Sequence, residues 1–269
     1  MTPAGRARDL TPEIAQFFRL MADETRLFIV RLLMLSDLRA GEIGAAASLP
    51  ANAVSYHLKR LSALGVLRDR QSSADARDVY YRLDISRLRA LYSAAGDALY
   101  PGMAARSGDQ TETQSETTTL SRPLRVLFLC THNSARSQMA EALLRSMGGD
   151  QVEAYSAGSM PTEVHLEAIG ALQALGVNTT VLYAKPMDQF VGEPFDYIIT
   201  VCDRVRDIRP AFLGDPAQAH WSIADPVVVE DPVRRAKAFR DTALELQTRI
   251  RYLLLLPHPA TGERFRLAR

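Results

Sequence analysis

The chain has 269 residues, 47% of them hydrophobic, so it exceeds one ordinary domain and has enough apolar side chains for two cores. Its formal net charge of +1 excludes a globally basic chain, and any contact with nucleic acid must come from a local patch. No apolar run approaches the roughly 18 residues that span a bilayer, and the first residues, MTPAGRARDL, lack the apolar core of a signal peptide. We therefore expect a cytoplasmic protein with two domains.

Apolar residues recur at helical spacing through residues 11–64 and predict four short helices. The first begins at Thr11, whose hydroxyl accepts hydrogen bonds from free backbone amides, and Pro12 fits its first turn. Leu49 and Pro50 separate the third helix from the fourth, which ends at Gly65. The later helices are expected at residues 23–35, 40–47 and 51–64. A short helix, a tight turn and a longer helix form a helix-turn-helix arrangement.

The fourth predicted helix has one apolar side and one polar side. Val54, Leu58 and Leu61 form a stripe that faces inward. The other side carries polar and basic side chains of the kind that contact bases and phosphates in a DNA groove. These candidate DNA-binding residues are Asn52, Ser55, Tyr56, His57, Lys59 and Arg60.

Two strands around a polar turn are predicted directly after this helix, in the segment VLRDRQSSADARDVYYRLD. We interpret this hairpin as a wing whose arginines contact phosphates. The arginines are Arg68, Arg70, Arg77 and Arg82. The alternative interpretation is a solvated basic hairpin on a protein-binding module.

Residues 11–100 resemble the ArsR-type winged-helix repressors, through MADETRL, AVSYHLKRLSALGVL and the arginine-flanked hairpin. The resemblance implies a homodimer that binds a roughly palindromic operator, with its seam formed by the first helix and the last one, residues 86–100. Family members that sense soft metals often carry cysteines before the recognition helix, but this stretch is SDLRAGEIGAAAS. We expect no metal site here, since soft ions prefer sulfur ligands and His57 alone does not make a site.

Residues 106–121, RSGDQTETQSETTTLS, are polar and nearly without large apolar side chains, and they predict a flexible linker. The expected domains are therefore residues 1–105 and 122–269. After the linker, short buried runs such as RVLFLC and DYIITVC alternate with helical stretches. This alternation predicts a three-layer α/β domain around a parallel sheet, next to the mainly helical first domain.

The segment RVLFLC-THNSARS places Cys130 at the end of a strand, five residues before Arg136 and Ser137, with a helix expected from Gln138 to Met147. Backbone amides at such a turn, together with the helix N-terminus, form an anion site, and a guanidinium holds two oxygens of a tetrahedral oxyanion. The expected anion-binding residues are Thr131, His132, Asn133, Ser134, Ala135 and Arg136.

Cys130 is the candidate nucleophile of this site. Positive surroundings favour a thiolate, so we expect the pKa of Cys130 to lie below the ordinary thiol value. Ser137 can donate a hydrogen bond to the sulfur, and Asn133 can brace the loop through its amide. The alternative is a buried cysteine that only ends a strand.

The second domain resembles the low-molecular-weight tyrosine phosphatases and the thiol-dependent arsenate reductases that share their fold. The resemblance covers residues 124–256 and rests on FLCTHNSARSQMAEAL, AYSAGSMPTEVHLEAI, DYIITVCD and HWSIADP. It implies four parallel strands, with the active site at their carboxyl ends. These strands are expected at residues 125–130, 152–156, 197–201 and 219–222. Asp225 matches the family's general acid, although an Asp-Pro pair is also a common turn element.

The second thiol separates the two activities. A phosphatase needs one cysteine, whereas reduction of As(V) needs two electrons and hence a second thiol that leaves a disulfide. Cys202 matches this resolving cysteine, and its alternative is a packing cysteine at a strand end. Val227, Val228 and Val229 stand where tyrosine phosphatases carry an aromatic clamp, which also favours arsenate.

One expected feature is missing. Reductases that use thioredoxin have a third cysteine shortly after the second, and Arg209 occupies that region here. An external thiol, such as mycothiol, glutathione or a thioredoxin-like protein, would then regenerate the enzyme, and no tightly bound cofactor is expected. The sequence thus predicts a fused transcriptional regulator and arsenate reductase. The alternatives are a regulator whose second domain only senses arsenic or redox state, and a phosphatase.

Overall fold

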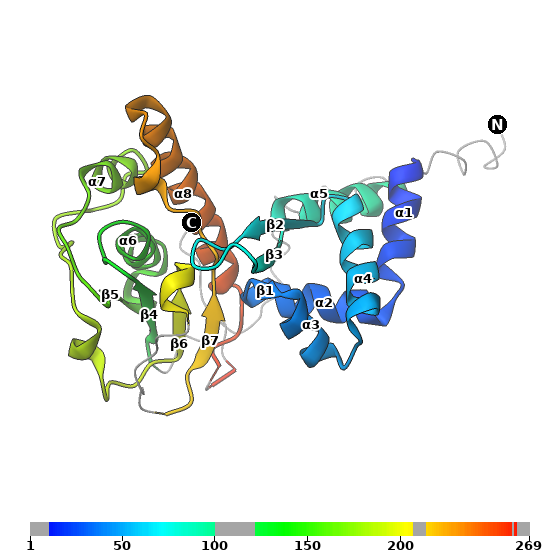
Figure 1. The fold of residues 1–269 in the computed structure, drawn as a ribbon, viewed down its shortest axis with the longest axis horizontal. Coiled ribbons are helices and arrows are strands. Elements are labelled where there is room, and N and C mark those ends of the chain that lie inside the picture. The colour runs from blue at the N-terminus through cyan, green and yellow to red at the C-terminus, as the bar shows by residue number, and fades with distance from the viewer. Residues whose placement is uncertain (1–10, 100–121, 207–213, 260, 263–269) are drawn as a thin grey trace. The chain divides into compact units, whose positions relative to one another are not determined.

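A computed structural model of the chain describes residues 11–99, 122–206, 214–259 and 261–262. The chain divides into two compact units, and each is described by itself (Figure 1). The linker predicted at residues 106–121 lies outside the described residues. In the described part of the chain, every helix is too short or too polar to cross a membrane.

Within residues 11–99, which the structure describes, five helices form most of the first unit. Thr11 caps the first, its side chain accepting from the N–H of Ile14 over 3.4 Å, and Asp23 caps the second by accepting from the N–H of Arg26 over 2.9 Å. The helices begin and end within a residue or two of the predicted bounds. They are α1 (Pro12–Met21), α2 (Glu24–Leu35), α3 (Ala40–Ala47), α4 (Ala51–Ala63) and α5 (Ile85–Leu99).

A small antiparallel sheet follows the helix-turn-helix and confirms the predicted hairpin. Strands β2 (Leu67–Gln71) and β3 (Val79–Leu83) pair along their full length. A third strand, β1 (Leu38–Arg39), pairs with the other edge of β3. The sequence did not predict β1, because two residues show no periodicity.

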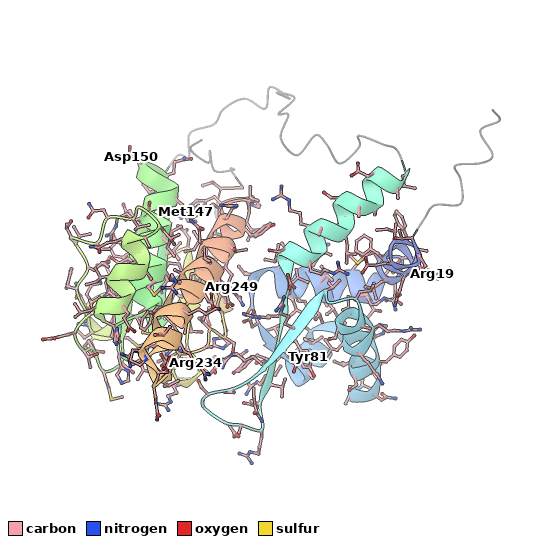
Figure 2. All side chains as sticks on the ribbon, turned by 90° about the horizontal axis from the view of Figure 1, so that it is seen from above. Arg19, Tyr81, Met147, Asp150, Arg234 and Arg249 are labelled. Carbon is pink, nitrogen blue, oxygen red and sulfur yellow. The ribbon has the colours of Figure 1, made fainter. Side chains whose placement is uncertain are left out.

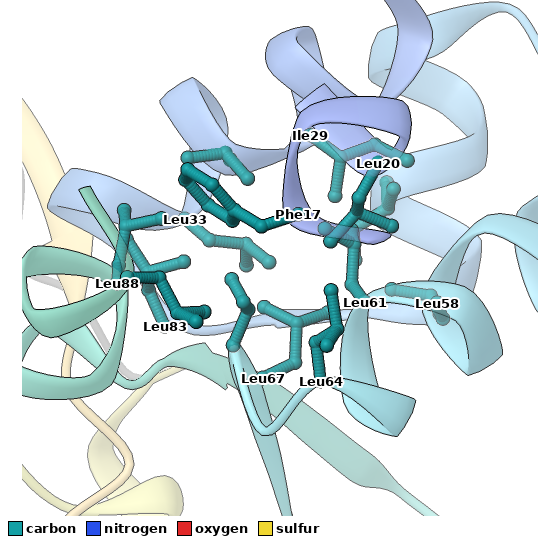
Figure 3. Close-up of a cluster of buried hydrophobic side chains, with 14 of the residues drawn as sticks. Phe17, Leu20, Ile29, Leu33, Leu58, Leu61, Leu64, Leu67, Leu83 and Leu88 are labelled. Carbon is teal, nitrogen blue, oxygen red and sulfur yellow. The ribbon is translucent and has the colours of Figure 1, made fainter. Parts of the chain in front are cut away.

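Leucine, isoleucine and phenylalanine side chains from all five helices and the hairpin fill the core of the first unit (Figure 3). Phe17, Ile29 and Leu61 are almost fully buried there. Val54, Leu58 and Leu61 lie on the buried side of α4, as predicted, so the opposite side faces outward. This packing fixes the direction in which the polar side of α4 points.

The second unit contains the predicted four-stranded parallel sheet, with strand order β5-β4-β6-β7. Its central pair buries side chains on both faces, which explains the continuous apolar runs of the sequence. The register sets Leu129 opposite Thr200, so Cys130, the last residue of β4, and Cys202, two residues after β6, lie at the carboxyl ends of adjacent strands. The strands are β4 (Leu124–Cys130), β5 (Val152–Gly158), β6 (Tyr197–Thr200) and β7 (Ala217–His220).

Three helices pack with this sheet: α6 (Arg136–Gly148), α7 (Leu166–Gln173) and α8 (Pro232–Leu253). Helix α6 contacts β4, β5 and both other helices, so it is the central helix of the unit. The side chains of Arg234 and Arg249 project from α8 (Figure 2), and the Arg249 guanidinium lies 5.7 Å from the centre of the Trp221 ring. The two-part fold class expected from the sequence is therefore confirmed.

Candidate active site and nucleic-acid interface

The loop between β4 and α6 folds back on the sulfur of Cys130. Asn133 has a φ of 48°, in the left-handed region that asparagine tolerates better than most residues. In this conformation its N–H donates to Cys130 Sγ over 3.0 Å. An amide of the loop thus faces the sulfur, which is the arrangement that an anion-binding loop requires.

The carbonyl groups of the loop are held by the segment that follows β5. Backbone N–H groups of residues 160–165 donate to three of them, at 2.8–2.9 Å. Because the N–H and C=O of one peptide point in opposite directions, these bonds make the N–H groups of the same peptides point away from residues 160–165. The sequence had given this segment no role. The three pairs are Met160 with Thr131, Thr162 with His132, and His165 with Ser134.

Gly158, at the end of β5, lies directly against the loop. A Cβ atom at this position would stand 2.7 Å from the carbonyl oxygen of Thr131 and 2.8 Å from the nitrogen of Asn133. Real Cβ atoms do not approach backbone this closely, so the loop conformation requires glycine here.

Cys130 is buried, with only 4% of its surface exposed. Its Sγ lies 2.8 Å from the hydroxyl oxygen of Ser137, as predicted. The predicted low pKa is wrong: burial raises the pKa of the Cys130 thiol, and the nearby Cys202 raises it further. Ser137, Arg136 and the Asn133 amide lower it, but by less than burial raises it.

Asn133 holds the loop through its side chain, as the sequence predicted. The amide nitrogen donates to the hydroxyls of Ser137 and Ser156, at 2.9 and 2.8 Å. The amide oxygen accepts from Gln138 Nε2 at 2.9 Å and from the backbone N–H of Lys185 at 2.7 Å. The amide therefore makes all four of the hydrogen bonds that it can make.

A buried ion pair behind Asn133 was missed by the sequence analysis. Lys185 Nζ lies 3.0 Å from Glu141 Oε2, and the two side chains are 4% and 3% exposed. Ser156 donates its hydroxyl to the same carboxylate, and Arg145 pairs with its other oxygen. The only signal in the sequence was a glutamate four residues after Ser137, on a helix whose neighbouring side chains are buried.

Arg136 and Asp225, predicted to act on the same oxyanion, form an ion pair. Arg136 Nη2 lies 2.6 Å from Asp225 Oδ2, and Nη1 donates to the carbonyl oxygen of Ile223 over 3.0 Å. The other carboxylate oxygen of Asp225 accepts from the N–H of Val227 and caps a short turn. Asp225 therefore also has the turn-forming role that was its alternative interpretation.

Cys202 lies two residues after Thr200, the last residue of β6, and is buried. Its Sγ lies 3.4 Å from the hydroxyl oxygen of Thr131, the first residue of the loop. Both cysteines are free thiols. The fold thus places the second thiol beside the loop that carries the first, whereas Arg209 lies outside the described residues.

The polar side of α4 carries most of the predicted DNA contacts. Asn52, Ser55, Tyr56, Lys59 and Arg60 are exposed, and the Arg60 guanidinium lies over the Tyr56 ring. His57 differs from the prediction: its side chain is only 13% exposed and lies 3.9 Å from Asp23.

The arginines of the hairpin are not equivalent. Arg68 lies 2.6 Å from Asp84, so it already has an anionic partner. Arg77 is exposed, whereas Arg70 and Arg82 are half-buried. Among the described residues, no cluster of three or more His, Cys, Asp or Glu side chains is suited to bind a metal ion.

The second unit thus has a parallel sheet whose first strand ends in a cysteine, a loop and the helix that carries Arg136. Together these define an α/β protein in which a cysteine precedes a strand-to-helix loop of the kind that binds anions. Residues 125–260 match the family model of the low molecular weight phosphotyrosine protein phosphatases, and the chain belongs to this family. Residues 23–69 match the model of the bacterial regulatory proteins of the arsR family.

Curated relatives of the second unit are arsenate reductases by name. The arsenate reductase of Halalkalibacterium halodurans is 33% identical over 105 residues, which cover 39% of this chain and 76% of the relative. The glutaredoxin arsenate reductase of Synechocystis sp. is 28% identical over 102 residues, covering 38% and 78%. The solved arsenate reductase of Archaeoglobus fulgidus is 28% identical, with a TM-score of 0.38, covering 48% and 97%.

Proposed function

We propose that the chain is a fused transcriptional regulator and thiol-dependent arsenate reductase. The observation that carries the proposal is the second buried thiol, with Cys202 Sγ 3.4 Å from the Thr131 hydroxyl at the start of the anion loop. The relatives named arsenate reductases support the same activity. A phosphatase has no use for a second thiol at this position.

In the proposed reaction, Cys130 passes its thiol proton to the bound oxyanion as its Sγ attacks arsenic, and an S–As bond forms. One oxygen leaves as water with a proton from Asp225, while Arg136 and the loop amides hold the remaining oxygens. Ser137 donates its hydroxyl to the sulfur. The Cys202 thiolate then attacks Cys130 Sγ, and the S–As electron pair passes to arsenic. The products are arsenite, with arsenic reduced from As(V) to As(III), and a Cys130–Cys202 disulfide.

An external thiol must reduce this disulfide in each cycle, because the chain has only two cysteines. A glutaredoxin, thioredoxin-like protein, mycothiol or glutathione has this chemistry, and one relative is named a glutaredoxin arsenate reductase. We place the protein in the cytoplasm, where free thiols persist.

We propose that the first unit binds operator DNA as a homodimer. The exposed polar side of α4 and the basic hairpin support a groove-and-phosphate contact. Helices α1 and α5 pack together and leave Phe18, Tyr92 and Leu99 exposed, with 37%, 52% and 63% of their surfaces accessible. These apolar side chains support a dimer seam along α1 and α5.

The experiment is arsenate turnover by the full chain with an excess of reduced thiol, measured as arsenite released. Wild type is expected to turn over repeatedly, and Cys130→Ser and Cys202→Ser to lose turnover. Hydrolysis of p-nitrophenyl phosphate that survives Cys202→Ser, without arsenate turnover, would instead identify a phosphatase.

A second candidate is a regulator whose second unit only senses arsenic or redox state. The favouring observation is that both cysteines of the chain lie in the second unit and none in the DNA-binding one. This candidate predicts a single binding event, without turnover, that changes operator affinity. Operator binding with and without arsenite, measured on the same preparation, separates it from the enzyme.

A further inference from the structure

Two buried histidine–aspartate pairs lie at opposite ends of β6. At the amino end, His258 Nε2 lies 3.5 Å from Asp196, and at the carboxyl end, His220 Nε2 lies 3.1 Å from Asp203. All four side chains are at most 5% exposed. Only the second pair adjoins the proposed reaction, since Asp203 directly follows Cys202.

We propose that His220 and Asp203 form a clasp that positions Cys202 for its attack on Cys130. This inference rests on the proposed function. Asp203 Oδ1 accepts from His220 Nε2 and, at 2.8 Å, from the hydroxyl of Ser222. His220 Nδ1 lies 2.8 Å from the Thr200 hydroxyl, so the imidazole joins the end of β6 to the residue after Cys202.

The clasp holds the chain after Cys202, where no strand pairing fixes the backbone. Before Cys202, the backbone is fixed on both edges, by Val201 N–H to the Leu129 carbonyl and by Trp221 N–H to the Thr200 carbonyl, each at 2.8 Å. After Cys202, the chain turns into a short 3-10 helix that begins at Asp203. The buried carboxylate of Asp203 ties this turn back to β7, because an unpaired buried charge would be costly.

The strand register shows why this tether matters for the second step. The register pairs Leu129 with Thr200, and the Val201 N–H still bonds to the Leu129 carbonyl, so Cys130 lies opposite Val201, the residue before Cys202. The two cysteines are then diagonal neighbours, about 6 Å apart at Cα from ordinary strand spacing and rise. A disulfide needs a Cα separation of roughly 4.4–6.8 Å, so the backbone is already within range.

The side chain of Cys202, however, lies against the Thr131 hydroxyl, 3.4 Å from its Sγ. The thiol must therefore turn about its own bonds while its Cα atom stays in place. Removing the clasp lets the Cα atom of Cys202 move, so its thiol reaches Cys130 Sγ less often and the disulfide forms more slowly. His220 and Asp203 are positioning residues, and neither touches the reacting atoms.

The test uses the full chain with His220→Phe, and with His258→Phe as the matched control. A single turnover with arsenate is quenched with iodoacetamide, and the Cys130–Cys202 disulfide is quantified by mass spectrometry. We expect His220→Phe to slow disulfide formation about tenfold or more, since small misplacements of reacting groups have effects of this size. His258→Phe should leave the rate unchanged, and His220→Gln, which keeps a donor toward Asp203, should recover most of it.

A second assay keeps the clasp testable if arsenate is not the substrate. Cys130 attacks the disulfide of dithiobis(nitrobenzoate) and releases one thionitrobenzoate. Cys202 then attacks the mixed disulfide on Cys130 and releases a second thionitrobenzoate. His220→Phe should slow only the second release. Because Thr200→Val removes only the hydroxyl that the imidazole contacts, it gives the same test if His220→Phe does not fold.

Three outcomes would overturn the clasp: an unchanged or faster second release in His220→Phe and Thr200→Val, equal slowing in His258→Phe, or equal slowing of both releases. If wild type gives the second release but no disulfide with arsenate, the proposed function fails and the clasp stands.

Discussion

The two units place their candidate functional side chains in opposite environments. On α4, Asn52, Lys59 and Arg60 lie on the surface, and the core beneath them fixes only the direction of the helix. Around Cys130, the side chains of Asn133 and Ser137 are buried, and the Asn133 amide is held by several others. The difference teaches that the proposed DNA contact would be spread over replaceable side chains, whereas the loop at Cys130 is held in shape by a network of buried contacts.

The sharpest way to break this network is Gly158→Ala. The added Cβ would displace the Thr131 carbonyl and the Asn133 amide from their present places. We expect kcat/KM for arsenate to fall about 100-fold, since the loop and sulfur lose their alignment. Steady-state kinetics of the full chain measure it.

Gly170, on α7, is the matched control. An alanine there meets nothing within 4 Å, and it should leave kcat/KM unchanged. An active Gly158→Ala protein would show that the close approach of loop and strand is not needed for turnover.

The next effect is on stability. Lys185→Met removes the cation from a buried pair and should reduce the free energy of unfolding by about 3 kcal/mol, the low end for such changes, because Arg145 still pairs with Glu141. Trp221, the only tryptophan, is buried in the second unit and reports its urea unfolding by fluorescence. The control is Lys237→Met, which removes an exposed pair with Asp241 and should have no measurable effect.

A smaller effect is expected in the pH dependence of Cys130. Its raised pKa means that the folded protein holds the thiol proton more tightly than the unfolded chain does. This contribution to stability is complete below the ordinary thiol pKa and is lost as the pH rises through the pKa of the folded state. Alkylation of Cys130 should accelerate with pH, with a midpoint above that of free cysteine.

Cys202→Ser sharpens this test, because the nearby Cys202 is the second cause of the shift after burial. The midpoint should fall in this variant and still exceed the ordinary value. A midpoint below that of free cysteine would contradict the assigned causes.

The smallest effects are expected on DNA. Lys59→Ala should reduce the slope of log affinity against log salt by about 1, equally on operator and random DNA. Arg68→Ala should reduce it less, because Arg68 already pairs with Asp84. Fluorescence anisotropy over a salt series measures both, and a larger loss in Arg68→Ala would refute the ranking.

Local signals account for what the sequence predicted. Helix bounds are marked by local residues, namely Thr11, Asp23 and the break at Pro50. The continuous apolar runs of the second unit predict a sheet that is covered on both faces. The loop was predictable because Cys130 and Arg136 have a fixed spacing at a strand-to-helix turn.

The missed features depend on residues far apart in the chain. Lys185 lies 44 residues from Glu141, and nothing near either predicts a buried pair. The direction of the Cys130 pKa shift failed for a similar reason, because burial is a property of the packed unit and not of the motif. His57 packs beside Asp23 although helical periodicity placed it outward.

The four hydrogen bonds of the Asn133 amide also bear on the chemical ageing of the protein. Asparagine deamidates when the nitrogen of the next residue attacks its side-chain carbonyl carbon, which requires the amide to rotate freely. The bonds to two hydroxyls, Gln138 and the Lys185 backbone hold this amide in one orientation. The same contacts that shape the loop therefore protect it from acquiring a carboxylate next to its sulfur, and lengthen its working life.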